Sequence, residues 1–159
     1  MAPSKTFNIP GLGFSFAVIE DPDLRKRFQA GRRGLIGEPN LLGMAAATAA
    51  YCGGQEWLDQ VLVYLRDNRD FLAEYIRREL PELPVTVPEG TYLAWVDCRA
   101  LDTQGQPASK FLMDKGRVAF NDGAHFGPGG DGFIRINFAC PRETLVAGLE
   151  RLRNAVRGG

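Results

Sequence analysis

The sequence predicts an α/β fold, in which helices cover a mostly antiparallel sheet. Three observations lead to this prediction. Residues 55–80 show helical periodicity in their apolar positions, whereas residues 92–96 and 133–138 are short apolar and aromatic runs typical of strands. Hydrophobic residues make up 45% of the chain and aromatic residues 10%, which is the composition of a globular protein with a core.

The first 54 residues predict short elements separated by turns. Residues 1–13 are rich in proline and glycine, and the apolar run at 14–19 predicts a strand. Asp23 is expected to cap a short basic helix that ends near Gly31. The alanine- and leucine-rich residues 41–52 predict a second helix, which Gly53 and Gly54 close.

The strongest periodic signal lies at residues 55–80. Apolar residues recur there at steps of three and four, charged residues fill the other side, and Pro81 ends the pattern. At about 1.5 Å per residue the helix would be about 39 Å long. We therefore expect one long amphipathic helix that bridges two lobes.

Beyond Pro81 the sequence predicts a small domain of mixed α and β structure. Glycine and proline place a loop at residues 121–132, and polar residues place another at 101–108. The remaining segments predict strands at 85–87, 92–96, 118–120 and 133–138, and helices at 110–115 and from 141 to about 156.

Composition argues against several classes of protein. The chain has 159 residues, with 19 basic and 19 acidic side chains and a net charge of +0, so we expect neither nucleic acid nor a membrane surface as a partner. No apolar run approaches the roughly 18–20 residues that cross a bilayer, and residues 1–8 lack the apolar core of a secretion signal. Cys52, Cys98 and Cys140 are widely spaced, which predicts small buried thiols in a reducing compartment, here the cytoplasm.

Common catalytic motifs are incomplete. Gly11 and Gly13 have the spacing of a dinucleotide-binding turn, but its third glycine is missing. Residues 13–17, around Ser15, match the hydrolase G-x-S-x-G motif only in part, and they lie inside a predicted strand. Asp122 and His125, the sole histidine, lack the paired spacing of a zinc site, so we expect no metal and interpret His125 as a polar loop residue.

Two cationic residues stand out. Alternation along residues 133–138 places Arg135 on the face opposite Ile134 and Ile136, where it either extends to water or holds a carboxylate with its planar fork. Lys5 lies in a turn, where it is either simply solvated or held so that its amine forms a Schiff base.

Residues 4–12, Ser-Lys-Thr-Phe-Asn-Ile-Pro-Gly-Leu, resemble the lysine segment of fold-type I pyridoxal-phosphate enzymes. Within the class I/II aminotransferase superfamily they are most similar to the MalY/PatB-like cystathionine β-lyases, also called C–S lyases. Six further segments agree with this family in the same order, so the resemblance covers essentially the whole chain: residues 57–59, 64–68, 88–95, 121–123, 126–127 and 133–139.

The resemblance implies a role for each of five residues. Lys5 would bind pyridoxal 5'-phosphate covalently and then remove the α-proton of an amino-acid substrate, with Ser4 and Asn8 as further cofactor-binding residues. Arg135 would hold the substrate α-carboxylate and Tyr92 would line the pocket. The implied reaction is β-elimination from cystathionine or cysteine to pyruvate, ammonia and a thiol. The alternatives are an aminotransferase acting on an L-amino acid, or a non-catalytic stand-alone or oligomerising domain.

Two positions depart from the family pattern. Related aminotransferases often carry phosphate-binding serine and arginine where this chain has Ala2 and Gly13. In the family, more than half of the enzyme precedes the lysine. We therefore expect residues 1–54 to be a remnant of the cofactor-binding large domain and residues 55–159 to be the small domain. The parent protein would be an enzyme, whereas this chain alone is expected to be inactive and to self-associate as a homodimer or larger assembly.

Overall fold

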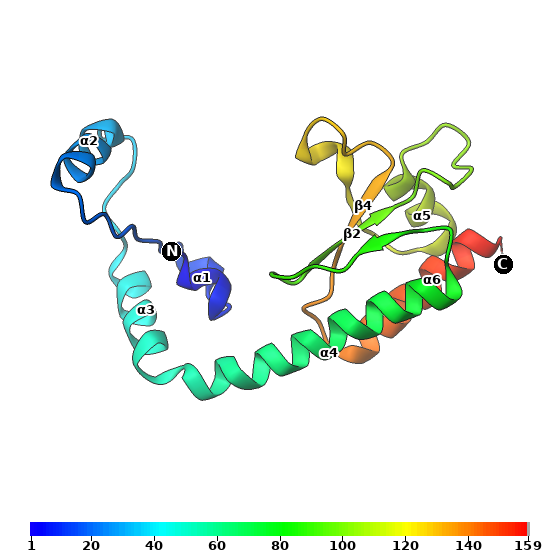
Figure 1. Cartoon of the computed structure of the whole chain (residues 1–159), viewed down its shortest axis with the longest axis horizontal. Helices are drawn as coiled ribbons and strands as arrows, with labels where there is room; N and C mark the ends of the chain where they lie inside the picture. Colours follow the sequence, from blue (N-terminus) through cyan, green and yellow to red (C-terminus); the bar gives the residue numbers. More distant parts are fainter. Residues whose placement is uncertain (159) are drawn as a thin grey trace. The chain divides into compact units, whose positions relative to one another are not determined.

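A computed structural model describes residues 1–158, and these residues form two compact units. The first unit comprises residues 1–62 and the second begins at Val63. Figure 1 shows the helices and strands of both units. The long helix α4 (Gln55–Glu79) begins in the first unit and ends in the second, and it confirms the amphipathic helix predicted at residues 55–80.

The first unit is helical. Its complete elements are α1 (Pro3–Thr6), the 3₁₀ turn η1 (Pro10–Leu12), α2 (Pro22–Arg32) and α3 (Leu41–Gly53). The predicted helix at 41–52 is therefore confirmed. The helix expected from Asp23 also exists, but its cap is Asp21, whose Oδ1 accepts from the Asp23 N–H at 2.8 Å. Pro22 fits the first helical position because it has no N–H to satisfy, which moves the cap one residue before it.

The strand predicted at residues 14–19 is wrong. Among the described residues, this segment pairs with no strand, and Phe16 exchanges its two backbone hydrogen bonds with Met1 (3.0 and 2.7 Å). Its aromatic residues pack against other rings instead: the centroid of the Phe16 ring lies 6.3 Å from that of Phe14 and 6.1 Å from that of Tyr51. An apolar run predicts a strand only where a neighbouring strand offers a ladder of hydrogen bonds.

The second unit is built on a four-stranded antiparallel sheet in the order β1-β2-β4-β3. The strands are β1 (Val85–Thr86), β2 (Leu93–Asp97), β3 (Asn121–Asp122) and β4 (Phe133–Asn137). The helices of this unit besides α4 are α5 (Ala108–Gly116) and α6 (Arg142–Arg157), and a 3₁₀ turn, η2 (Gly123–Phe126), follows β3. The predicted fold class, a small antiparallel sheet covered by helices, is confirmed.

The core of the second unit lies on one face of this sheet. Ala94, Val96, Ile134 and Ile136 are at most 3% exposed and face the helices. Apolar residues of α4, α5 and α6 complete the cluster, among them Leu72, Ile76, Leu112, Leu145, Leu149 and Leu152. Strict alternation along β2 and β4 leaves the other face of the sheet for polar and aromatic side chains.

The strand predicted at residues 118–120 is also wrong, since the ladder begins only at Asn121, opposite Arg135. Val118 and Phe120 pack against the core cluster from outside the sheet. Their hydrophobicity is therefore explained by burial, and the loop predicted at 121–132 instead contains β3 and η2.

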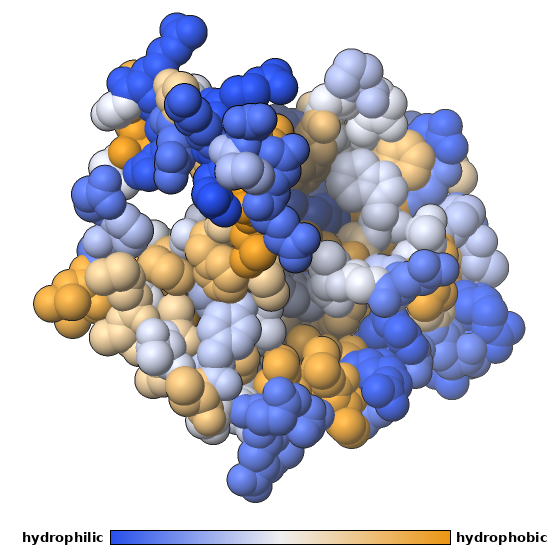
Figure 2. Space-filling view, turned by 60° about the vertical axis from the view of Figure 1, so that its left-hand side comes forward, coloured by the Kyte–Doolittle hydropathy of each residue, from blue (hydrophilic) through white to orange (hydrophobic). Residues whose placement is uncertain are grey.

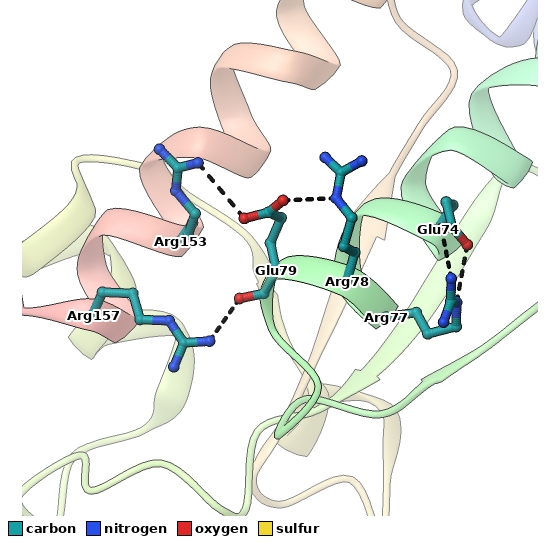
Figure 3. A network of polar contacts seen from close by, with 6 residues as sticks. All are labelled: Glu74, Arg77, Arg78, Glu79, Arg153 and Arg157. Atoms are coloured by element: carbon teal, nitrogen blue, oxygen red, sulfur yellow. Dashed lines mark hydrogen bonds and ion pairs between the residues drawn. The ribbon is translucent and has the colours of Figure 1, made fainter.

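The carboxyl end of α4 is held by two arginines of α6 (Figure 3). Arg157 donates from Nη2 to the backbone oxygen of Glu79 at 2.7 Å, and Arg153 lies 3.9 Å from the Glu79 carboxylate. Because the last carbonyls of a helix lack intrahelical partners and carry partial negative charge, a guanidinium there stabilises the helix end.

None of the helices within residues 1–158 has an apolar stretch long enough to span a membrane. In the same residues, no cluster of three histidine, cysteine or acidic side chains is arranged to hold a metal ion.

Cys98 is buried as predicted. Burial, and to a lesser extent the nearby Asp97 charge, raises the pKa of its thiol to about 12. Cys52, in contrast, is exposed.

Candidate functional site

Lys5 lies in α1, a single helical turn. Its backbone N–H donates to the Ala2 carbonyl at 3.0 Å, and the Ser4 carbonyl accepts from the Ile9 N–H at 3.0 Å. The Lys5 side chain is exposed, and the ion pairs formed among residues 1–158 do not include it. A primary amine is therefore presented to solvent on an ordered turn.

The turn that carries Lys5 is fastened to α3 on both sides. The Phe7 ring meets the Tyr51 ring edge-on, with centroids 5.4 Å apart. At the other end of the helix, the Nδ2 of its cap, Asn40, donates to the Leu12 carbonyl at 2.6 Å. Two contacts at opposite ends of α3 thus hold residues 7–12, the chain immediately after the lysine.

The neighbours of Lys5 differ in what they offer a ligand. Ser4 is half-buried, whereas Asn8 is exposed and has a left-handed backbone with φ of 53°, which asparagine tolerates. Ala2 and Gly13 contribute no side-chain hydrogen-bond donor. An anionic group next to Lys5 would therefore rely on Ser4, Asn8 and backbone N–H groups in this part of the chain.

Arg135 lies in the middle of β4, where its register partners are Trp95 on β2 and Asn121 on β3. Ile134 and Ile136 are buried on the opposite face, so the side predicted for Arg135 from alternation is confirmed. The Nη2 of Arg135 donates to the Asn121 Oδ1 at 3.0 Å.

The Arg135 guanidinium also lies over an aromatic ring. Its Cζ is 4.2 Å from the centroid of Phe126, the last residue of η2. The Phe126 ring in turn meets Trp95 edge-on, with centroids 5.8 Å apart and planes at 76°. Within residues 1–158, the Arg135 Nε is buried without a hydrogen-bond partner and no carboxylate pairs with the guanidinium. A charged fork with unused donors is suited to bind a carboxylate.

Sequence reasoning did not identify Trp95, Asn121 and Phe126 as neighbours of Arg135. Alternation along residues 92–96 puts Trp95 on the same face as Arg135 if the two strands pair, so that contact had a signal in the sequence. Asn121 and Phe126 lie in a segment predicted to be a loop, and their approach to Arg135 depends on how that segment folds back onto β4.

Tyr92 precedes β2 and is half-buried against the core cluster. Its carbonyl accepts from the Phe138 N–H at 3.0 Å, which ties the start of β2 to the end of β4. The structure thus gives Tyr92 a packing role, and its place in a pocket stays a prediction.

His125 is an exposed residue of η2. Its neighbour Asp122 accepts from the Ser109 hydroxyl at 2.6 Å and from the Ala124 N–H at 2.9 Å. The Ser109 bond first, and the backbone bond second, lower the pKa of Asp122. The Ser109 hydroxyl donates to the Asp122 carboxylate rather than to the His125 imidazole, so these three side chains are not arranged as a hydrolase triad.

Lys5 belongs to the first unit and Arg135 to the second. The contacts described for Lys5 come from residues of the first unit, and those described for Arg135 come from residues of the second.

The fold is that of the pyridoxal-phosphate-dependent aminotransferase class. The chain matches the crystal structure of cystalysin from Treponema denticola, which contains a pyridoxal 5'-phosphate cofactor, with a TM-score of 0.89 and 37% identity over 99% of this chain and 40% of that chain. It also matches the pyridoxal-phosphate-bound C–S lyase from Staphylococcus hominis, with a TM-score of 0.88 and 36% identity over 98% of this chain and 41% of that chain.

Curated sequences narrow the class to a family. The chain is 38% identical to Protein MalY of Escherichia coli (strain K12) over 156 residues, which is 97% of this chain and 40% of MalY. It is 36% identical to cystathionine beta-lyase PatB of Bacillus subtilis (strain 168), over 98% of this chain and 40% of PatB. The chain is thus homologous to the carboxyl-terminal part of the MalY/PatB-like proteins, as its motifs indicated. It spans about 40% of the length of these relatives, and no family model matches it.

Proposed function

We propose that this chain is the carboxyl-terminal part of a pyridoxal-phosphate-dependent C–S β-lyase. The observation that carries the proposal is the homology to MalY and PatB over 97% and 98% of the chain. Lys5 and Arg135 support it, because each presents a cation that no carboxylate among residues 1–158 neutralises. We also infer that residues 1–54 belong to the cofactor-binding large domain and residues 55–159 to the small domain.

The residues around Lys5 fit this cofactor in part. The exposed amine of Lys5, on a turn anchored to α3, suits a covalent bond to an aldehyde, with Ser4 and Asn8 beside it. Ala2 and Gly13 leave two positions without side-chain donors for a phosphate. When bound, pyridoxal phosphate supplies a conjugated ring that stabilises negative charge at the substrate α-carbon.

Two side chains of this chain act in the proposed reaction. The Arg135 guanidinium holds the α-carboxylate and so orients the bond between the α-carbon and its hydrogen. The Lys5 amine, once free, accepts that proton at Nζ. The electron pair of the broken C–H bond forms a double bond to the β-carbon as the thiolate leaves with the electrons of the C–S bond. Water then converts the remaining fragment into pyruvate and ammonia.

An aminotransferase is the second candidate. It is favoured by 29% identity to the LL-diaminopimelate aminotransferase of Dehalococcoides mccartyi over 153 residues. Lys5 and Arg135 would serve both reactions equally, because both begin with the same α-proton transfer. The reactions differ in whether a β-thiolate leaves or an amino group is passed to a 2-oxo acid.

We further propose that the protein self-associates. Large apolar side chains are exposed in the first unit, and Figure 2 shows apolar (orange) patches on the face turned toward the viewer. On α3, Leu41 is 75% exposed and Leu42 is 69% exposed, whereas Phe14 and Phe16 are half-buried. Light scattering tests this proposal, and replacing Leu41 and Leu42 by serine should lower the measured mass.

We also place the protein in the cytoplasm, because its three cysteines are free.

The lyase proposal is tested on the gene product that carries these 159 residues, supplied with pyridoxal phosphate and L-cystathionine. We expect pyruvate and thiol release without any amino acceptor, and loss of both in Lys5→Ala. Lys110→Ala is the matched control, since Lys110 pairs with Asp114 on α5 at 2.7 Å. Product formation that requires a 2-oxo acid would instead support the aminotransferase, and turnover that survives Lys5→Ala would exclude both.

We also propose that the 159 residues alone are inactive and hold the cofactor weakly, because Ala2 and Gly13 offer its phosphate no side-chain donor. Stoichiometric pyridoxal phosphate followed by borohydride reduction and peptide mapping should label Lys5 no more than Lys26, another exposed lysine. Selective labelling of Lys5, or pyruvate release by this chain, would contradict the proposal.

A further inference from the structure

The guanidinium of Arg135 is held by two groups that come from different elements. We propose that Asn121 and Phe126 are positioning residues for Arg135, which fix the plane and direction of its fork before a ligand arrives. The inference rests on the proposed function only in naming that ligand, the α-carboxylate of an amino acid.

Asn121 restrains the fork within its plane. It lies directly opposite Arg135 in the β3–β4 register, and its Oδ1 accepts from Arg135 Nη2 at 3.0 Å. Nη2 carries a second N–H, so this bond leaves it able to donate to a ligand as well. Rotation of the guanidinium about its terminal torsions would break the bond.

Phe126 restrains the fork perpendicular to its plane. Its ring centroid lies 4.2 Å from Arg135 Cζ, within the distance of a cation–π contact. Phe126 remains 50% exposed although it is a large apolar residue, so burial alone does not explain its position. Trp95 supports the ring from the neighbouring strand β2 through the edge-on contact at 5.8 Å.

The loop that presents Phe126 has little freedom. Asp122 anchors the start of η2 through its bonds to Ser109 and Ala124. Gly123 lies so close to Gly130 that a Cβ on either residue would collide with the carbonyl oxygen of the other.

At the other end of η2, Gly127, directly after Phe126, donates its N–H to the Ala124 carbonyl at 3.3 Å. Its φ of 112° and ψ of −172° fall in a region that is essentially restricted to glycine. These contacts at both ends of η2 hold the Phe126 ring against the Arg135 guanidinium.

Contact with the Phe126 ring matters because an arginine side chain has many rotamers, and restricting them on binding lowers the affinity for a ligand. A fork ordered in advance binds a planar carboxylate with less loss of conformational entropy. Removing Phe126 should therefore weaken carboxylate binding without removing the charge of Arg135.

The first test uses the 159-residue chain and the ¹⁵N-labelled arginine side chains. In the unchanged protein we expect the Arg135 Nε–H proton to be shifted by the Phe126 ring and to exchange slowly. Phe126→Leu, which keeps an apolar side chain, should abolish both effects, and Phe126→Tyr should retain them. Phe71→Leu is the control, because it removes a different arginine–ring contact of this unit, Arg142 over Phe71 at 4.4 Å.

Asn121→Ala should likewise speed exchange at Arg135. An Arg135 signal that is the same in Phe126→Leu and in the unchanged protein would overturn the proposal, whatever the reaction is. Unchanged thermal midpoints verify that each variant is folded.

The second test measures turnover of L-cystathionine by the gene product that carries this chain. A cation–π contact of ordinary strength corresponds to about a 2- to 30-fold rise in KM at nearly constant kcat for Phe126→Leu, with rescue by Phe126→Tyr. An equal KM in both variants would contradict the positioning role. Absence of turnover in every form, the unchanged protein included, would contradict the proposed function and leave the NMR test to decide the role of Phe126.

Discussion

Replacing Asn68 by alanine removes three hydrogen bonds from the interior of the second unit. Asn68 lies on α4 and is fully buried. Its Nδ2 donates to the carbonyls of Phe138 and Cys140, both at 2.9 Å, and its Oδ1 accepts from the Nε of Arg142 at 2.8 Å. One side chain thus joins α4 to the segment that connects β4 with α6.

The cost of this change follows from the bonds that are lost. Two neutral bonds contribute about 1 kcal/mol each and the bond to a guanidinium about 1.5–3 kcal/mol, so the loss is about 3.5–5 kcal/mol. That is a large part of the roughly 5–15 kcal/mol that stabilises an ordinary domain. With a urea dependence of about 2 kcal/mol per molar, the unfolding midpoint should fall by about 1.8–2.5 M.

The assay is urea unfolding followed by tryptophan fluorescence. In a Trp57→Phe background the signal comes from Trp95, which lies in the sheet of the second unit. Asp67→Ala is the matched control, because Asp67 is an exposed polar residue of the same helix and should shift the stability by less than about 0.5 kcal/mol. A midpoint for Asn68→Ala equal to that of Asp67→Ala would refute the reasoning.

Three further outcomes are expected. Arg157→Ala removes the guanidinium that donates to the Glu79 carbonyl at the end of α4. The thermal midpoint measured by calorimetry should fall by an amount equivalent to about 1 kcal/mol. Added salt should reduce this effect without abolishing it. The pKa of the Asp122 carboxyl is lower in the folded protein than the unfolded value of about 3.9. Its contribution to the free energy of unfolding is therefore present above the unfolded pKa and is lost as the pH falls through the folded pKa. Ser109→Ala removes the main cause of this shift, so it should flatten the acid side of the stability profile measured by urea unfolding. Burial raises the pKa of Cys98 to about 12, so mass spectrometry should find this thiol unmodified by iodoacetamide at pH 8 until urea unfolds the chain.

Each of these outcomes has a contrary result. An unchanged thermal midpoint in Arg157→Ala would show that water caps the α4 end equally well. Acid unfolding that is identical with and without the Ser109 hydroxyl would remove Asp122 from the acid sensitivity. Alkylation of Cys98 at the rate of the exposed Cys52 would mean that the core around Cys98 opens readily.

Most helices were predictable because their signals are local. The three- and four-residue spacing at 55–80 corresponds to α4, because it reports one apolar face of a helix, and the alanine-rich composition at 41–52 corresponds to α3, because it reports helix propensity. The strands at 92–96 and 133–138 were found for the same reason. The false strands at 14–19 and 118–120 arose because an apolar run does not reveal whether it will pair with a strand or pack against other side chains.

The candidate site was predictable only in part. Lys5 and Arg135 were singled out from a motif and from strand alternation, which are both properties of short segments. Asn121 and Phe126 were not, because their contacts with Arg135 depend on a loop that must fold back across β4. Asn68 was seen as a position within a helix, and its role arises from partners 70 to 74 residues away.

By itself the sequence determined the helices at 41–52 and 55–80, the strands at 92–96 and 133–138, the buried face of the sheet and the resemblance to the MalY/PatB-like family. These properties depend on residue type and on spacing within a few turns or strand lengths. The tertiary structure alone decided which polar groups satisfy Asn68, which apolar runs pair as strands, and that Phe126 lies on Arg135. The physical reason is that hydrogen bonds and ring contacts need atoms within a few ångströms, and only the folded chain brings distant segments that close.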